Sequence, residues 1–155
     1  MRLLLLLPLA AIVAALVFAA YVRLAPSDPM TWHTDPAQAR PALGHFVVLP
    51  EGGDAPSPRF AASPADVLEA LDAVALATPR TTRLAGSPQE GRITYVTRSR
   101  LWGFPDYTTV AAQPVDGGTA LVLHARLRFG QSDLGVNAAR VEVWLNALQD
   151  AMPSA

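Results

Sequence analysis

The chain opens with a continuous apolar segment, residues 3–22, flanked by Arg2 and Arg23. At about 1.5 Å rise per residue, a helix of this length spans roughly 30 Å, the thickness of the hydrocarbon core of a bilayer. Because no polar stripe interrupts the segment, a core helix of a soluble domain does not account for it. We therefore predict one transmembrane helix and assign residues 1–24 to a signal-anchor.

A cleavable secretory signal is the alternative to a retained anchor. The apolar region of such a signal is commonly about 7 to 15 residues long and ends at small residues. The best cleavage site here, Val17-Phe18-Ala19, fits that pattern poorly, so an uncleaved anchor is favoured. With one arginine on each flank, we expect the default orientation, a short N-terminus inside and the domain outside. This predicts a bacterial inner-membrane protein whose domain faces the periplasm.

Residues 25–62 are rich in proline, glycine, aspartate and serine and show no sustained hydrophobic period. This composition is typical of a linker, so we expect a tether along the surface, with one extended piece at residues 45–49. A helix start follows, where Ser63, Pro64 and Asp66 supply an N-cap, a first-turn proline and a first-turn acid. Apolar residues then recur at helical spacing up to about residue 76.

The hydrophobic period changes to two after this helix. Candidate strands cover residues 81–84, 92–101, 107–113 and 120–129, and the Asp-Gly-Gly sequence at 116–118 joins the last two as a hairpin. In the last strand, alternate residues from Leu121 to Phe129 are apolar. The residues between them, Val122, His124, Arg126 and Arg128, predict a second face that is wet or contacts a ligand.

A final helix is predicted from an N-cap at Asn137, with an apolar stripe at Val141, Trp144, Leu145, Leu148 and Met152. The order of helix, strands and helix predicts an α+β fold for residues 63–152. We expect an antiparallel sheet of about four strands, flanked by an N-terminal and a C-terminal helix and preceded by the transmembrane helix.

Composition excludes several kinds of binding site and partner. The formal net charge is −1, so no overall field attracts nucleic acid, and the absence of cysteine excludes disulfides and thiolate metal sites. His33 and His45 lie in the expected tether without a second spaced pair of ligands. We therefore predict no metal, no cofactor and no nucleic-acid partner.

Two segments are chemically distinctive: Gly103-Phe104-Pro105-Asp106, and residues 128–140 with the sequence RFGQSDLGVNAAR. Here the chain resembles the DUF1499 family, bacterial envelope and plastid proteins of uncharacterised function, whose pattern is F-P-D followed by S-R-x-G-x-S-D-x-G-x-N-x-x-R. The resemblance covers roughly residues 63–148 and departs at Leu127, where the family favours serine. It implies a shared fold and no known activity. The matching positions are Asp106, Arg128, Ser132, Asp133, Gly135, Asn137 and Arg140.

Electrostatics suggests how these positions interact. Arg140 is expected in the first turn of the last helix, where a cation opposes the helix dipole. Asp133 and Asp106 are candidate partners for Arg140 and Arg128, in a carboxylate–guanidinium network at one end of the sheet. The arginines would then lower the pKa of both carboxyls. The functional alternative is an anion site formed by the two arginines and by backbone N–H groups near Asn137.

Two basic rows are also predicted, Arg98 and Arg100 on one strand and Arg126 and Arg128 on another, lying side by side across the sheet. Like charges placed opposite each other destabilise a sheet unless something neutralises them. We expect either acidic side chains of the domain or an anionic surface, such as lipid headgroups, to cover these rows.

No catalytic residue is predicted. Ser132 and His124 with an aspartate would suit a hydrolase, but no G-x-S-x-G elbow surrounds the serine. The sequence predicts a membrane-anchored cell-envelope protein with a non-catalytic binding or scaffolding domain, whose partner is anionic lipid or an envelope protein. The alternative is a domain that binds a small ligand or lipid in a cavity between the sheet and the C-terminal helix. A hydrolase ranks third.

Overall fold

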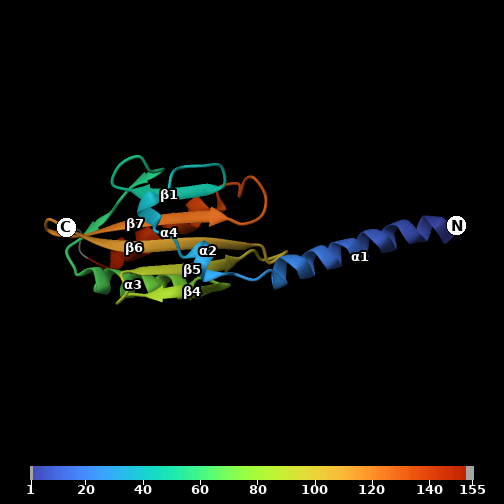
Figure 1. Ribbon diagram of the computed structural model, residues 1–155, viewed down its shortest axis with the longest axis horizontal. Helices are drawn as coiled ribbons and strands as arrows, with labels where there is room; N and C mark the ends of the chain where they lie inside the picture. Colours follow the sequence, from blue (N-terminus) through green and yellow to red (C-terminus); the bar gives the residue numbers. More distant parts are fainter. Residues whose placement is uncertain (1, 153–155) are drawn as a thin grey trace.

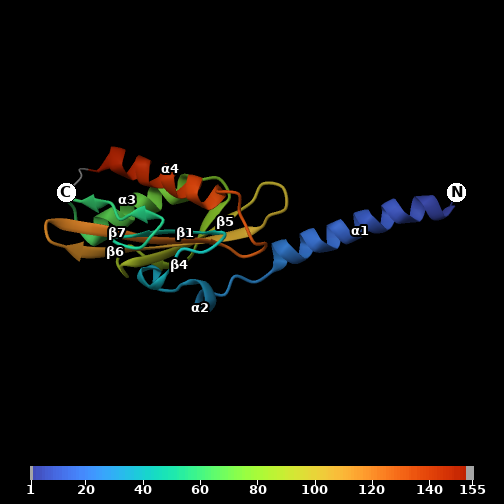
Figure 2. The ribbon, with the colours of Figure 1, turned by 90° about the horizontal axis from the view of Figure 1, so that it is seen from above.

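The computed structural model describes residues 2–152, in which a central sheet separates two different layers. Helices α3 (Pro64–Ala77) and α4 (Val136–Ala151) cover one face. Residues 25–44, which include α2 (Pro29–Trp32) and the 3-10 helix η1 (Pro36–Gln38), cross the other (Figure 2). Helix α1 (Arg2–Leu24) extends away from one end of the sheet (Figure 1). We call this the α1 end of the domain.

The sheet has seven strands in the order β2-β1-β7-β6-β5-β4, and β3 also pairs with β7. Strands β4 (Thr81–Ser87), β5 (Arg92–Arg98), β6 (Pro105–Val115) and β7 (Gly118–Leu127) correspond to the four that the sequence predicts. The other three are β1 (His45–Leu49), β2 (Ala55–Pro56) and β3 (Arg59–Phe60). The α+β class is as predicted, but the expected strand number is too small, and because β1 and β2 are parallel the sheet is not purely antiparallel.

The segment expected to be a tether contributes the three short strands β1, β2 and β3 to this sheet. Strand β1 matches the predicted extended piece and pairs with β7 over four residues, from His45 opposite Arg126 to Val48 opposite Leu123. Val47 and Leu49 of β1 are buried with Ala39 and Val122 in a small second core. Strands two to five residues long are too short to display a period, which is why composition alone suggested a linker.

The main core lies between the sheet and the two helices. The predicted stripe of α4 is buried there at Val141, Trp144 and Leu148, and the predicted stripe of α3 packs beside it. The Trp144 ring meets the Tyr95 ring edge to face with centroids 5.5 Å apart, and its Nε1 donates a 2.8 Å hydrogen bond to the Thr78 hydroxyl. These contacts join both helices to the sheet, as the periodicity predicted.

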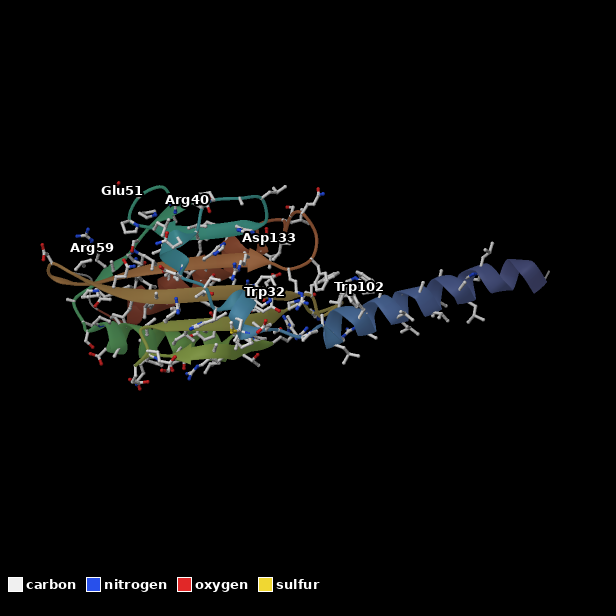
Figure 3. All side chains as sticks on the ribbon, viewed as in Figure 1. Trp32, Arg40, Glu51, Arg59, Trp102 and Asp133 are labelled. Carbon is white, nitrogen blue, oxygen red and sulfur yellow. The ribbon has the colours of Figure 1, made fainter. Side chains whose placement is uncertain are left out.

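The last turns of α1 pack against the domain. Phe18 lies edge to face with Trp102 at 6.1 Å and with Phe104 at 6.0 Å, and Tyr21 contacts Phe129 at 6.0 Å. Figure 3 shows Trp102 beside the base of the helix. By length and composition α1 is apolar enough to cross a membrane, although a signal sequence has the same properties.

Candidate functional site

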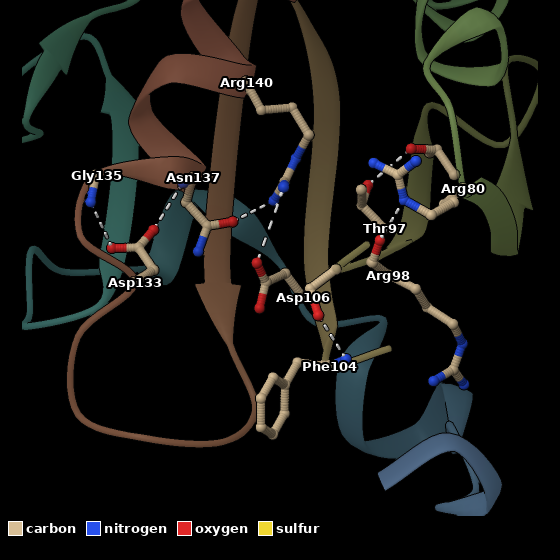
Figure 4. A network of polar contacts seen from close by, with 11 residues as sticks. Arg80, Thr97, Arg98, Phe104, Asp106, Asp133, Gly135, Asn137 and Arg140 are labelled. Carbon is tan, nitrogen blue, oxygen red and sulfur yellow. Dashed lines mark hydrogen bonds and ion pairs between the residues drawn. The ribbon is translucent and has the colours of Figure 1, made fainter. Parts of the chain in front are cut away.

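The family-like residues gather at the α1 end of the sheet, where four paired positions lie in one row: Thr81, Thr97, Asp106 and Leu127. Helix α4 begins at the same end. Figure 4 shows that its Arg140 side chain reaches down toward the Asp106 carboxylate. The start of β6 and the first turn of α4 therefore place one acid and one base next to each other.

Asp106 and Arg140 form a loose, largely buried ion pair. The Nη1–Oδ2 distance is 3.8 Å, and the side chains are 17% and 9% exposed. Arg140 Nη2 also donates to Asn137 Oδ1. Among the described residues, Arg140 Nε and Asn137 Nδ2 are buried without a hydrogen-bond partner. The ion pair thus leaves two buried N–H donors without acceptors, unlike a structural network in which every buried polar group has a partner.

Burial raises the pKa of Asp106 to about 6, while Arg140 opposes this shift and Asp133 adds to it. Arg140 thus acts in the expected direction, but burial outweighs it, so the expected net lowering of the Asp106 pKa is wrong. A 3.8 Å ion pair is too long to be a hydrogen bond, so it offsets only part of the desolvation of the carboxylate. Burial likewise lowers the pKa of Arg140.

Asp133 serves the helix rather than the arginine. Its Oδ2 accepts a 2.7 Å hydrogen bond from the backbone N–H of Asn137, and its Oδ1 accepts one of 3.2 Å from Gly135. The residue at the N-cap position is Gly135, with a φ of 83°, so the predicted cap at Asn137 is wrong by two residues. An acid preceding the cap supplies the acceptor that the free N–H groups need. Ser132 is exposed, and its Oγ accepts from the N–H of Leu134.

Arg128 does not join the network. Its Nη1 donates to the Pro26 carbonyl at 2.7 Å and to the Tyr107 hydroxyl at 3.2 Å. Arg126 donates to the Trp32 carbonyl at 2.8 Å and lies 4.9 Å from the centre of the Trp32 ring. Carbonyl oxygens and an indole ring therefore contact these two arginines, with no acid beside them, although Arg126 Nε is buried without a hydrogen-bond partner among the described residues.

The two predicted basic rows are not neighbours, because β6 separates β5 from β7. Strand β5 also ends at Arg98, so Arg100 lies in the exposed turn that follows. The Arg98 guanidinium donates to the Gly103 carbonyl across that turn. Lipid headgroups are thus not needed to explain Arg126 and Arg128, while Arg100 is open to solvent.

The histidines lie on the sheet face opposite the helices. His33 Nδ1 is 2.8 Å from the Thr94 hydroxyl, and His124 Nε2 is 3.0 Å from His45 Nδ1. Burial lowers the pKa of His124 to about 4, with further lowering by Arg126 and His45. His124 therefore pairs with another histidine and not with Ser132. In the described part of the chain, no group of three His, Asp or Glu side chains is placed to hold a metal.

Two cavities meet at Asp106. One, of about 530 Å³, lies between the sheet and the first turns of α4; we call it the arginine cleft, because Arg80, Arg98, Arg100 and Arg140 line it. The other, of about 620 Å³, is the aromatic cavity, lined by Phe18 of α1 together with Phe104 and Phe129. Ser99, Asp106 and Val136 line both.

Of the residues that line these cavities, the sequence had selected Asp106, Arg140, Arg98, Arg100, Ser132 and Asp133. It missed Arg80 and the side chains of the aromatic cavity. Phe104 and Phe129 both lie within the two distinctive segments, which is a signal that could have identified the aromatic cavity. Arg80 gives no such signal, because only the β4–β5 pairing brings it to this end of the sheet.

Among curated proteins, no sequence matches this chain at a significant level. One family, described as "Protein of unknown function (DUF1499)", matches residues 24–148. The match includes the whole of segment 25–62, whose strands complete the sheet, as well as the Asp106 and Arg140 positions. The chain belongs to the DUF1499 family.

Proposed function

We propose that this chain is a single-pass membrane protein of the bacterial cell envelope, and that its periplasmic domain binds other molecules at the membrane surface without catalysing a reaction. The observation that carries the proposal is the exposure of large apolar side chains in the loops at the α1 end of the domain. Leu43, Leu101 and Leu134 are 74%, 75% and 93% exposed there. Exposed apolar side chains at the same end of a domain as an apolar helix are typical of a surface that lies against lipid.

The packing of α1 supports an anchor that is retained. Val22 is fully buried against the domain, and Arg23 Nη2 donates a 2.8 Å hydrogen bond to the Leu101 carbonyl. Cleavage after Ala19 would remove Phe18 and its two aromatic contacts. An anchor that forms part of the folded domain is more consistent with these contacts than a signal that is removed.

Binding is favoured over catalysis by the state of the candidate residues. The Ser132 hydroxyl is engaged by its own turn, and His124 by His45. A scaffolding role is consistent with the filled core between the sheet and both helices. The alternative, ligand binding between the sheet and the C-terminal helix, is supported by the arginine cleft in that position.

The membrane contact can be tested on the full chain in lipid nanodiscs. The protein lacks cysteine, so Leu134→Cys and Asp116→Cys each introduce one site for an environment-sensitive fluorophore. Residue 134 lies at the α1 end, whereas Asp116 lies in the β6–β7 turn at the opposite end. Spin-labelled lipid should quench the fluorophore at 134 and leave the one at 116 unchanged.

Equal quenching at both sites, or at neither, would overturn the proposal that the α1 end rests on lipid. Intact-mass measurement of the membrane fraction tests the anchor independently. The expected species retains α1, and a species beginning at Ala20 would show that the apolar segment is a cleaved signal.

A further inference from the structure

The arginine cleft carries a strong excess of positive charge. Four arginines line it, and Asp106 is the only acid among its lining residues. Arg80 uses its Nε to bond the Arg98 carbonyl, and the Arg100 side chain makes no hydrogen bond within the described chain. Guanidinium N–H groups are therefore available on the wall of the cleft. Such groups match the oxygens of a phosphate or a carboxylate.

Arg140 provides a second, independent indication of a ligand. Its side chain is only 9% exposed, yet its Nε has no partner and its Nη1 is 3.8 Å from Asp106. A guanidinium has five N–H donors, and here Asn137 is the one hydrogen-bond acceptor found for them. Buried donors are nearly always satisfied in folded proteins. An anionic oxygen in the cleft would supply the missing acceptor.

The same cleft also has an apolar wall, which a small inorganic anion does not require. Val143 is 64% exposed and lines the cleft beside the buried Trp144. The aromatic cavity begins on the other side of Asp106 and reaches Phe18 of α1. Because the two cavities share Ser99, Asp106 and Val136, the basic cleft is continuous with an aromatic cavity that reaches the helix able to cross the membrane.

We infer that the two cavities form one binding site for a membrane amphiphile with an anionic phosphate or carboxylate head. The head lies among Arg80, Arg100 and Arg140, and the acyl chain extends along Phe104 and Phe129 toward α1. This assignment rests on the proposed function, because the chain of the ligand is drawn from the bilayer that surrounds the anchor. The head chemistry is shared with soluble phosphates, so the experiment must distinguish the two sources.

The test uses the full chain in nanodiscs that contain phosphatidylglycerol and phosphatidylcholine, with retained lipid measured by native mass spectrometry. The wild-type protein should retain phosphatidylglycerol in preference. Arg80→Gln with Arg100→Gln should weaken that retention about fivefold to tenfold through loss of charge-assisted hydrogen bonds. Both side chains are exposed, so the fold should survive. The matched control is Arg59→Gln, an exposed arginine that Figure 3 shows at the opposite end of the sheet.

Two further arms separate a lipid from a soluble anion. Val143→Asn removes an apolar side chain from the exposed wall without adding a charge that would itself repel an anion, and it should reduce phosphatidylglycerol retention without affecting folding. Glycerol phosphate, the soluble counterpart of the head, should bind at least about a hundredfold more weakly than the lipid, because it buries no acyl chain. Equal affinity for glycerol phosphate, unchanged in Val143→Asn, would assign the cleft to a soluble anion and overturn the amphiphile site.

Equal lipid retention in the double arginine variant and in Arg59→Gln would also overturn the site. Failure of the site and failure of the membrane proposal give different results. If the fluorophore at residue 134 contacts lipid but no phosphatidylglycerol is retained, only the binding site is excluded. If that fluorophore does not contact lipid, the proposed function itself fails.

Discussion

The two faces of the sheet are stabilised by different kinds of interaction. The helix-covered face buries apolar side chains from alternate positions of β7, such as Leu121, Leu123 and Ala125. The opposite face carries His124 and Arg126, and it is covered by the polar segment 25–44 through directional hydrogen bonds to Trp32 and Thr34. Burial of apolar surface does not depend on direction, so it tolerates small displacements of side chains, whereas a hydrogen bond weakens when its distance or angle changes. The second face should therefore respond more sharply to single polar changes and to pH.

The largest effect is expected on the helix-covered face. Trp144→Ala removes the largest fully buried side chain and should destabilise the domain by about 3 to 5 kcal/mol, through lost burial and a residual cavity. Urea unfolding of the full chain measures this loss. Leu134→Ala, at an exposed position, is the control and should change stability by less than about 0.5 kcal/mol. A loss below about 1 kcal/mol for Trp144→Ala would show that the main core lies elsewhere.

A smaller loss of stability is expected for changes on the opposite, polar face of the sheet. The Trp32 ring stacks on Tyr107 with centroids 3.8 Å apart and lies beneath the Arg126 guanidinium. Trp32→Ala should cost about 2 kcal/mol from the lost stacking and cation–π contact, and Trp32→Phe should recover part of it. If both variants unfold at the wild-type urea concentration, segment 25–44 is not a stabilising layer.

Each face also contributes one titrating group to the pH dependence of stability, and the two contributions have opposite signs. Folding raises the pKa of Asp106 from 3.8 to about 6, so in this window the native state holds a proton that the unfolded chain releases. Its contribution to stability therefore increases as the pH falls. Folding lowers the pKa of His124 from 6.5 to about 4, so the unfolded chain binds the proton first and stability decreases as the pH falls.

Single substitutions separate these opposing contributions. Asp106→Asn should make the protein lose stability more steeply than wild type on acidification from about pH 7 to about pH 4, and His124→Gln should make it lose less. The differences should reach about 1 to 2 kcal/mol, since one pKa unit corresponds to about 1.4 kcal/mol. Urea melts across this range provide the measurement. Parallel pH profiles for all three proteins would contradict both pKa shifts.

The contrast between the faces also explains how much could be predicted from the sequence. The stripes of α3 and α4 have clear periods, and so does β7, so core residues such as Trp144 and Leu123 were identified correctly. The prediction that the second face of β7 is wet or contacts a ligand is wrong at Val122 and His124, which are buried because segment 25–44 covers them. Segment 25–44 satisfies the polar face through carbonyls such as those of Pro26 and Trp32. Backbone acceptors leave no trace in residue type, and composition suggested a tether instead.

The site was predictable to a similar extent. Asp106 and Arg140 were both selected, and the structure brings them together. Asp133 was given the wrong role, because an acid two residues before the N-cap of a helix can accept from the first N–H groups as well as form an ion pair. Arg128 was misassigned because its carbonyl partner comes from a segment 102 residues earlier in the chain.

The most direct test of contact between the domain and the membrane is fluorescence of the full chain in nanodiscs made with brominated lipid. Trp102 lies at the base of α1, whereas Trp32 lies over the sheet and Trp144 is in the core (Figure 3). We predict strong quenching of the wild-type emission and loss of most of that quenching in Trp102→Phe. Unchanged wild-type emission, or equal quenching in both proteins, would contradict a domain whose α1 end rests on the bilayer.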